Sequence, residues 1–172
     1  MKKILIIGFV ILSLLFVWSV VWAASVGPSS PGTMADDATV GTATWGTTDN
    51  AKVSDNTYST VALFCGSSVV SENSIKIVKG GSITGTEKST AAALTTSDAY
   101  VSYGGASDLW GTTWTPDDIN ASTFGVVFST KQSGVISHYL EATNFNFAIP
   151  AGATIDGILV EVEQKYAGSA PC

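Results

Sequence analysis

The fold class of this chain is decided by one stretch near its C-terminal end, Ile155-Asp156-Gly157-Ile158-Leu159-Val160-Glu161-Val162-Glu163. Successive side chains of a β-strand point to opposite faces. We therefore expect a strand here that carries Ile158, Val160 and Val162 on one face and Glu161 and Glu163 on the other. Such a strand suits an antiparallel sheet that covers a core on one side and meets water on the other.

Shorter alternating stretches recur through the rest of the chain. They cover residues 58–64, 74–78, 124–128 and 145–149, and Gly-rich turns separate them. Many short strands with turns of this kind predict an all-β fold. Among all-β folds we expect an antiparallel jelly-roll-like β-sandwich, preceded by an N-terminal apolar signal or anchor helix.

One short segment departs from the β pattern. In Thr115-Pro116-Asp117-Asp118, threonine is a favoured N-cap, proline suits the first helical position, and Asp118 lies three residues after the cap. We expect a single helical turn here that ends near Asn120.

The N-terminal end has the organisation of an export signal. Lys2 and Lys3 precede an apolar run over residues 4–21, and Ala23 offers a small residue at a cleavage point. The run is also near the ~18 residues at which a membrane span becomes plausible. We predict a signal peptide or membrane anchor over residues 1–24. A linker over 25–33, a β-sandwich domain over 34–166 and a tail over 167–172 follow it.

Export predicts an extracellular or cell-surface location, with membrane contact only through residues 4–21 where the signal is not cleaved. All eight basic residues are lysines, and two of them precede the apolar run, so six follow it, against fourteen Asp and Glu. Nucleic-acid binders usually carry a basic patch, and arginine is the preferred bidentate partner of phosphate. We therefore expect no nucleic-acid partner.

No pattern of catalytic residues stands apart from a simpler structural explanation. His138 is the only histidine and lies in a predicted strand. Glu161 and Glu163 fit a solvated strand face better than the paired carboxylates of a glycosidase. We therefore expect a protein that is not an enzyme.

The most unusual segment, residues 97–116, gathers aromatic and acidic side chains in a Gly-rich loop region. Aromatic faces stack on sugar rings, and carboxylates accept hydrogen bonds from sugar hydroxyls. We therefore take Tyr103, Asp108, Trp110 and Trp114 as candidate residues for binding a polysaccharide or surface glycan. In the alternative, the two tryptophans plug the end of the sandwich.

Two further sites are candidates, each with an alternative. Asp49 and Asp55 lie in oxygen-rich turns that could bind calcium, and aspartate also favours turns for local reasons. We expect no other cofactor. Cys65 and Cys172 could form a disulfide in an exported protein, or they could remain unpaired.

Several longer segments of the sequence resemble an uncharacterised β-sandwich module of phage and environmental bacterial proteins, which are often secreted or virion-associated. Examples are Lys76-Ile77-Val78-Lys79-Gly80-Gly81 and Ile149-Pro150-Ala151-Gly152-Ala153-Thr154-Ile155-Asp156-Gly157-Ile158. The resemblance covers most of residues 33–165. It rests on three blocks: residues 41–45 with 49–58, residues 76–81 with 103–111 and 119–126, and residues 139–147 with 149–158. It implies a structural or binding role at an extracellular or particle surface and supplies no catalytic residues.

The order of these blocks differs from that in the modules they resemble. The second block usually comes after the third, and a further strand usually closes the fold. This closing strand is absent here, as in a rearranged chain or a fragment. Without it, we expect an open sheet edge. Such an edge invites pairing with another chain. We therefore expect self-association or completion by a partner.

These observations lead to a non-enzymatic extracellular or surface β-sandwich module with a binding or structural role, glycan being its candidate ligand. The alternative is a structural component of a virion, filament or cell surface with no small-molecule ligand.

Overall fold

The computed structural model describes residues 29–63 and 69–167, and within them strands make up nearly all of the regular secondary structure. The strands are β1 (Thr33–Asp37), β2 (Trp45–Gly46), β3 (Thr60–Val61), β4 (Ser71–Lys79), β5 (Ser82–Thr84), β6 (Ala99–Gly105), β7 (Gly125–Gln132), β8 (Val135–Ile136), β9 (Tyr139–Thr143) and β10 (Ile158–Gln164). A 3-10 helix, η1 (Thr48–Lys52), and an α-helix, α1 (Pro116–Asn120), complete the elements. The predicted all-β class is confirmed. The predicted N-terminal signal or anchor lies outside the described residues.

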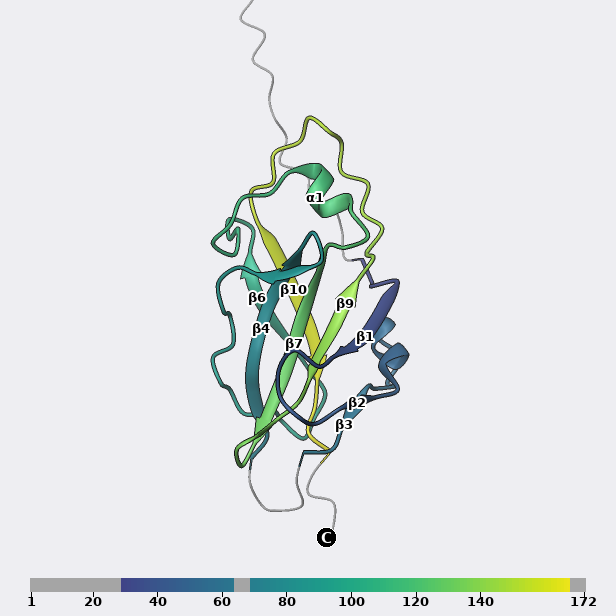
Figure 1. Ribbon diagram of the computed structural model, residues 1–172, viewed down its shortest axis with the longest axis vertical. Coiled ribbons are helices and arrows are strands. Elements are labelled where there is room, and N and C mark those ends of the chain that lie inside the picture. The colour runs from purple at the N-terminus through teal and green to yellow at the C-terminus, as the bar shows by residue number, and fades with distance from the viewer. Residues whose placement is uncertain (1–28, 64–68, 168–172) are drawn as a thin grey trace, which may run out of the picture.

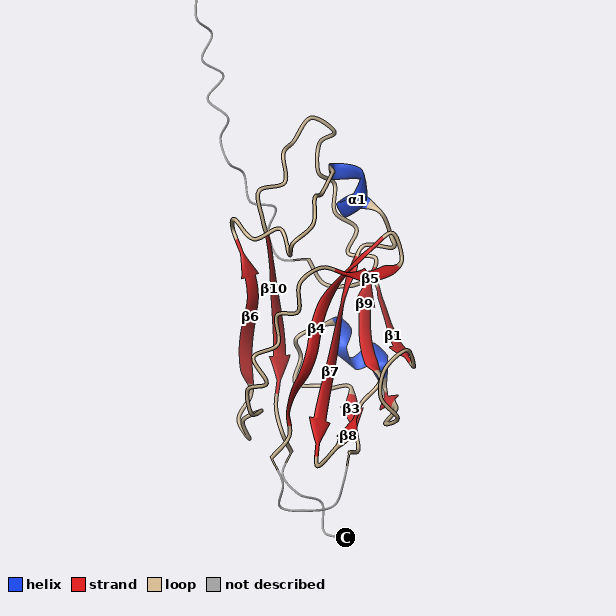
Figure 2. Ribbon diagram, turned by 60° about the vertical axis from the view of Figure 1, so that its left-hand side comes forward, coloured by secondary structure: helices blue, strands red, loops and turns tan. Residues whose placement is uncertain are grey.

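The strands form two layers of unequal width (Figures 1 and 2). The wider layer has the strand order β1-β9-β7-β4-β5, and β8 also pairs with β7. The narrower layer consists of β6 and β10 alone, and a small third sheet joins β2 to β3. All of the strand pairs are antiparallel.

The core lies between the two layers. Ile75 and Ile77 of β4 and Phe128 of β7 pack with Tyr103 of β6. Ile158, Val160 and Val162 of β10 pack against this cluster, whereas Leu159 and Glu161 are exposed. The alternation predicted for this strand is thereby confirmed, although the strand begins at Ile158 rather than at Ile155.

A β-bulge changes the phase of β4. The register with β7 shifts between Glu72 and Ser74, which leaves Asn73 as the extra residue. In a regular strand, Glu72 would point away from the face that carries Ile75 and Ile77, because it lies an odd number of positions from each of them in the sequence. The bulge turns Glu72 to the same face, toward the core.

The predicted helical turn is confirmed as α1. Thr115 is its N-cap, and a capping box joins Thr115 to Asp118. The Asp118 backbone N–H donates to the Thr115 hydroxyl at 3.2 Å, and the Thr115 N–H donates to the Asp118 carboxylate at 2.8 Å. The hydrogen bonds from Thr115 lower the pKa of Asp118, and Lys79 adds to them.

Two predicted strands are not formed as expected. Over residues 145–149 the alternation is real, since Phe145, Phe147 and Ile149 pack against the core, but no strand forms. Asn144 and Asn146 have φ values of 59° and 54°, a left-handed conformation that interrupts an extended chain. Of residues 58–64, only Thr60 and Val61 form a strand, and Phe64 lies outside the described residues.

Candidate functional site

The clearest candidate site is the open side of the narrow layer. β10 pairs with β6 over its whole length, from Ile158 opposite Gly105 to Gln164 opposite Ala99. The described residues place no strand along its other edge. The Ile158 N–H donates to the Asp108 carbonyl on the β6 side. Because the backbone groups of a strand alternate in direction, those of Leu159, Glu161 and Glu163 point toward the open edge.

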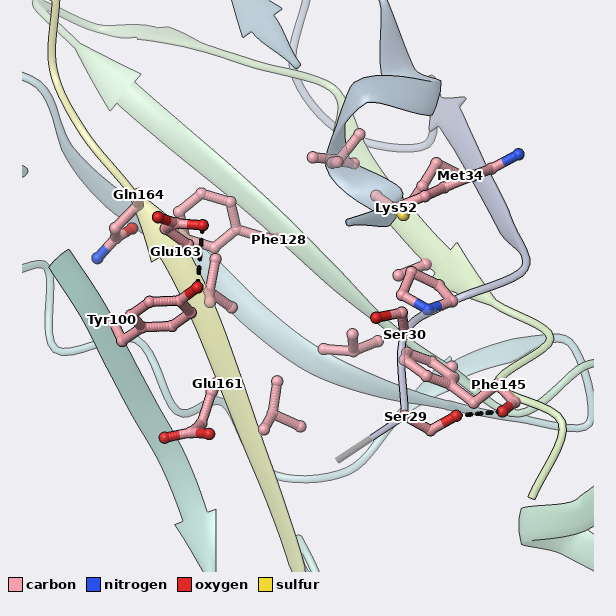
Figure 3. Close-up of a pocket in the computed structure, with 18 of the residues that line it drawn as sticks. Ser29, Ser30, Met34, Lys52, Tyr100, Phe128, Phe145, Glu161, Glu163 and Gln164 are labelled. Atoms are coloured by element: carbon pink, nitrogen blue, oxygen red, sulfur yellow. Dashed lines mark hydrogen bonds between the residues drawn. The ribbon is translucent and has the colours of Figure 1, made fainter. Parts of the chain in front are cut away.

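An apolar cleft of about 1890 Å³ lies beside this edge. Its lining includes Met34 of β1, Leu140 and Ala142 of β9, and Val160 and Val162 of β10. Figure 3 shows Ser29, Ser30 and Met34 on the side opposite Glu161, Glu163 and Gln164. Leu140, Val160 and Val162 remain only half-buried. The cleft is therefore apolar core surface that the narrow layer leaves partly uncovered.

A buried polar cluster lies beside the cleft at Gln164. The Tyr103 hydroxyl donates to the Glu72 carboxylate at 2.6 Å, and the Gln164 amide nitrogen donates to the same oxygen at 3.4 Å. Burial and the neighbouring Glu72 carboxylate raise the pKa of Tyr103 well above its usual range. Within the described part of the chain, the Gln164 amide oxygen and the Thr130 hydroxyl are buried without a hydrogen-bond partner.

The outward side of the β10 edge is acidic. Glu163 accepts a hydrogen bond from the Tyr100 hydroxyl at 3.1 Å (Figure 3). It also accepts one from the Ser54 hydroxyl at 2.8 Å. Ser102 donates to Glu161 at 3.4 Å. Tyr100 is 58% exposed, and it is the one exposed aromatic side chain in the described segments.

The aromatic residues predicted to bind glycan lie inside the core. Trp110, Trp114 and Tyr103 are 0%, 8% and 5% exposed, respectively. Trp114 packs edge-on against Phe124 with 5.5 Å between ring centroids. None of the three rings presents a face to solvent. Their position agrees with the alternative in which the tryptophans plug the end of the two layers.

Trp110 is held by a specific backbone arrangement. Its indole N–H donates to the Ile158 carbonyl at 3.0 Å, and its own φ of 57° is left-handed. Gly104 lies beneath the ring with a φ of 78°, and a Cβ there would stand 2.6 Å from the Trp110 Nε1 atom. Only glycine fits this position, so Gly104, Trp110 and Ile158 form one joint between β6 and β10.

The fourth residue predicted to bind glycan, Asp108, already has partners. Its carboxylate lies 2.6 Å from the Lys88 ammonium and accepts the Trp110 backbone N–H at 2.8 Å. These two hydrogen bonds, that of Lys88 first, hold the pKa of Asp108 below its usual value. In this structure Asp108 anchors the loop that carries Trp110.

The residues predicted to bind calcium also have local partners. Asp49 lies 2.8 Å from the Lys52 ammonium, and Asp55 accepts the Thr57 backbone N–H at 2.9 Å. Across residues 29–63 and 69–167, no three His, Cys, Asp or Glu side chains group to hold a metal ion. Cys65 and Cys172 lie outside the described residues.

His138 does have the orienting carboxylate that a catalytic base needs. Its Nδ1 atom lies 2.8 Å from Asp36, and Asp36 also accepts the Trp45 backbone N–H. Burial opposes the charged form of Asp36, but these hydrogen bonds outweigh it and lower its pKa. Neither His138 nor Asp36 lines the cleft. Together with Trp45, whose indole donates to the His138 carbonyl at 2.8 Å, they join β1 to the start of β9.

Sequence reasoning missed the cleft and Tyr100. A local signal for Tyr100 was present, because Tyr100 and Ser102 alternate with Val101 and Tyr103, and this pattern places them on the outer face. No local signal marks the cleft, since it depends on which strands pair.

The structural class is thus an all-β protein with antiparallel sheets and an open apolar cleft. Comparisons with protein family models, curated proteins and solved structures find no match to this chain. Neither helix in the described segments has the length and hydropathy of a membrane span.

The burial of Trp110 generates a prediction. Trp110→Ala removes a fully buried side chain, and we expect the free energy of unfolding to fall by about 3–5 kcal/mol. Urea unfolding followed by circular dichroism measures this change. The control is Tyr100→Ala on the exposed face, for which we expect a loss below about 1 kcal/mol. Equal small losses in both variants would show that Trp110 is not a core residue.

Proposed function

We propose that this chain is a non-enzymatic, jelly-roll-like β-sandwich module of an extracellular or surface protein, and that it binds through the open side of its narrow layer. The observation that carries the proposal is the apolar cleft of about 1890 Å³ beside an unpaired strand edge. A large apolar pocket with a few convergent polar groups is the usual form of a binding site.

The chemistry of the cleft supports binding rather than catalysis. Three acidic side chains line it, those of Asp156, Glu161 and Glu163. Glu161 and Glu163 lie on one strand and share one face, so they do not flank a substrate bond from opposite sides as a glycosidase pair would. The His138–Asp36 pair lies away from the cleft lining. The alternative is a structural component of a virion, filament or cell surface, which would use the same open edge for assembly.

Binding in the cleft is tested with Nile red, a neutral apolar dye. We expect the dye to bind the folded protein and to gain fluorescence, because Leu140 and its neighbours offer partly uncovered apolar surface. Leu140→Glu places a charge in this surface and should weaken dye binding on the order of tenfold, which corresponds to about 1.4 kcal/mol.

The matched control is Val69→Glu, which alters an exposed apolar residue that does not line the cleft. We expect its dye affinity to equal that of the unmodified protein. If Leu140→Glu and Val69→Glu bind the dye equally well, the cleft is not the binding surface.

A second candidate function is glycan binding at Tyr100, in place of the buried tryptophans. Tyr100 is exposed, and the carboxylate of Glu163 and the hydroxyl of Ser54 contact its hydroxyl. An exposed ring beside hydrogen-bonding groups is what stacking on a sugar requires.

Screening on a glycan array tests this second candidate. Tyr100→Ala should reduce the signal of any bound glycan by about tenfold. The control Leu159→Ala changes an exposed aliphatic residue of the adjacent strand and should leave the signal unchanged. A glycan signal that survives Tyr100→Ala would exclude Tyr100 as the binding residue.

A further inference from the structure

We propose that the occupant of the cleft is an extended segment of a partner polypeptide, which adds to β10 as a neighbouring strand and in which branched apolar residues alternate with lysine or arginine. This inference rests on the proposed function and names the class of partner for the same site. Four observations carry it: the free edge, the size of the cleft, its unpartnered polar atoms and its charge.

The free edge supplies the backbone pairing. The outward-directed N–H and C=O groups of Leu159, Glu161 and Glu163 have no backbone partner in the described part of the chain. Among the described residues, the Ser54 side chain donates a hydrogen bond to the Glu163 side chain near one end of this edge. A strand added along such an edge gains main-chain hydrogen bonds from alternate residues, and side chains on one of its faces enter the adjacent cleft.

The size of the cleft favours a chain segment over a small molecule. Pockets for small molecules usually have volumes of about 300–1,000 Å³. The cleft, at about 1890 Å³, exceeds that range. It also follows β10, whose seven residues extend about 23 Å at ~3.3 Å per residue. An elongated apolar cleft beside a strand fits another strand.

Two buried polar atoms point to a polypeptide partner. Thr130 is 1% exposed and Gln164 is 8% exposed, and both line the cleft. Among the described residues, the Thr130 hydroxyl and the Gln164 amide oxygen lack a hydrogen-bond partner. Buried polar groups are nearly always paired. Both atoms are closed to solvent in this structure. A side-chain rotation that exposed them would let a peptide backbone, which carries donors and acceptors together, satisfy both, whereas an aliphatic ligand could satisfy neither.

The negative charge of the edge favours basic residues in the partner strand. No lysine of the described segments forms an ion pair with Glu161 or Glu163, and Lys165 pairs with Asp98 at 3.2 Å. Side chains directly opposite on neighbouring strands lie about 4.5–5.5 Å apart, where opposite charges attract and like charges repel. Basic residues on the outward face of the partner strand would therefore lie beside the two glutamates.

The same charges disfavour a second copy of β10 as the occupant. If β10 strands from two copies paired about a two-fold axis centred on Glu161, each Glu161 would face the other. The partner strand is therefore expected to come from a different sequence, with valine or isoleucine entering the cleft toward Leu140 and Val162.

The test uses fluorescein-labelled peptides and the whole chain. A peptide of four Lys-Val repeats should bind, as measured by fluorescence anisotropy. A block peptide of the same composition, four lysines followed by four valines, should bind at least about tenfold more weakly. A Lys-Val peptide that is N-methylated at its lysine amides should also bind at least about tenfold more weakly. Methylation there removes the N–H donors of the residues that would lie opposite Glu161 and Glu163.

A charge exchange provides the matched variants. The double substitution Glu161→Lys, Glu163→Lys should shift the preference from the Lys-Val peptide to a Glu-Val peptide. The control Asp49→Lys, Asp117→Lys makes the same change in net charge away from the cleft and should keep the original preference. A preference that follows net charge in both variants would overturn the inference.

The remaining outcomes separate this inference from the proposed function. If neither alternating peptide binds but Nile red still binds at Leu140, the strand partner is wrong and the binding cleft stands. If neither the peptides nor the dye binds, both are wrong. If the chain alone forms concentration-dependent dimers with protected β10 amides, a second copy is the occupant, and the proposed partner is wrong.

Discussion

The structure depends on the unequal width of its two layers. A path of five strands, β1-β9-β7-β4-β5, faces a layer of only two strands, β6 and β10. Two strands cover the inner face of β4 and part of β7, where Ile75 and Ile77 are fully buried. They do not cover the inner face of β9, where Leu140 is half-buried. Exposed apolar surface is unfavourable in water. Other parts of the chain therefore cover some of the apolar surface that the narrow layer leaves open.

Loops supply part of the cover that strands do not. Figure 2 shows loops at the end of the molecule that carries α1. Trp110 and Trp114 belong to the core cluster between the layers, and Phe145 and Phe147 stack beside Phe124. Asp108 and Lys88 hold the Trp110 loop, and Gly104 lets the indole reach the Ile158 carbonyl. The same residues that we took from sequence as a ligand site thus close one end of the core. These loops do not fill the cleft beside β10.

The features that could be predicted from sequence are those set by local physics. The period of two predicted the faces of β10 and placed Ile75 and Ile77 together, and the capping residues Thr115 and Asp118 predicted α1. The bulge at Asn73, which turns Glu72 into the core, depends on pairing with β7 and has no local signature. Asn144 and Asn146 break an otherwise strand-like pattern by adopting the left-handed conformation, which asparagine tolerates better than most residues, and Phe145 between them packs against Phe124. The cleft follows from strand order, which couples residues far apart in the chain, so alternation alone could not reveal it.

Amide hydrogen exchange along β10 tests whether this strand has one free edge. The N–H groups of Val160, Val162 and Gln164 point toward β6, in phase with that of Ile158, whereas those of Leu159, Glu161 and Glu163 point away. We expect alternating exchange, with slow amides at Val160, Val162 and Gln164 and fast amides at Leu159, Glu161 and Glu163. Uniformly slow exchange along the strand in the isolated chain would contradict this expectation, because it would mean that the edge is already paired.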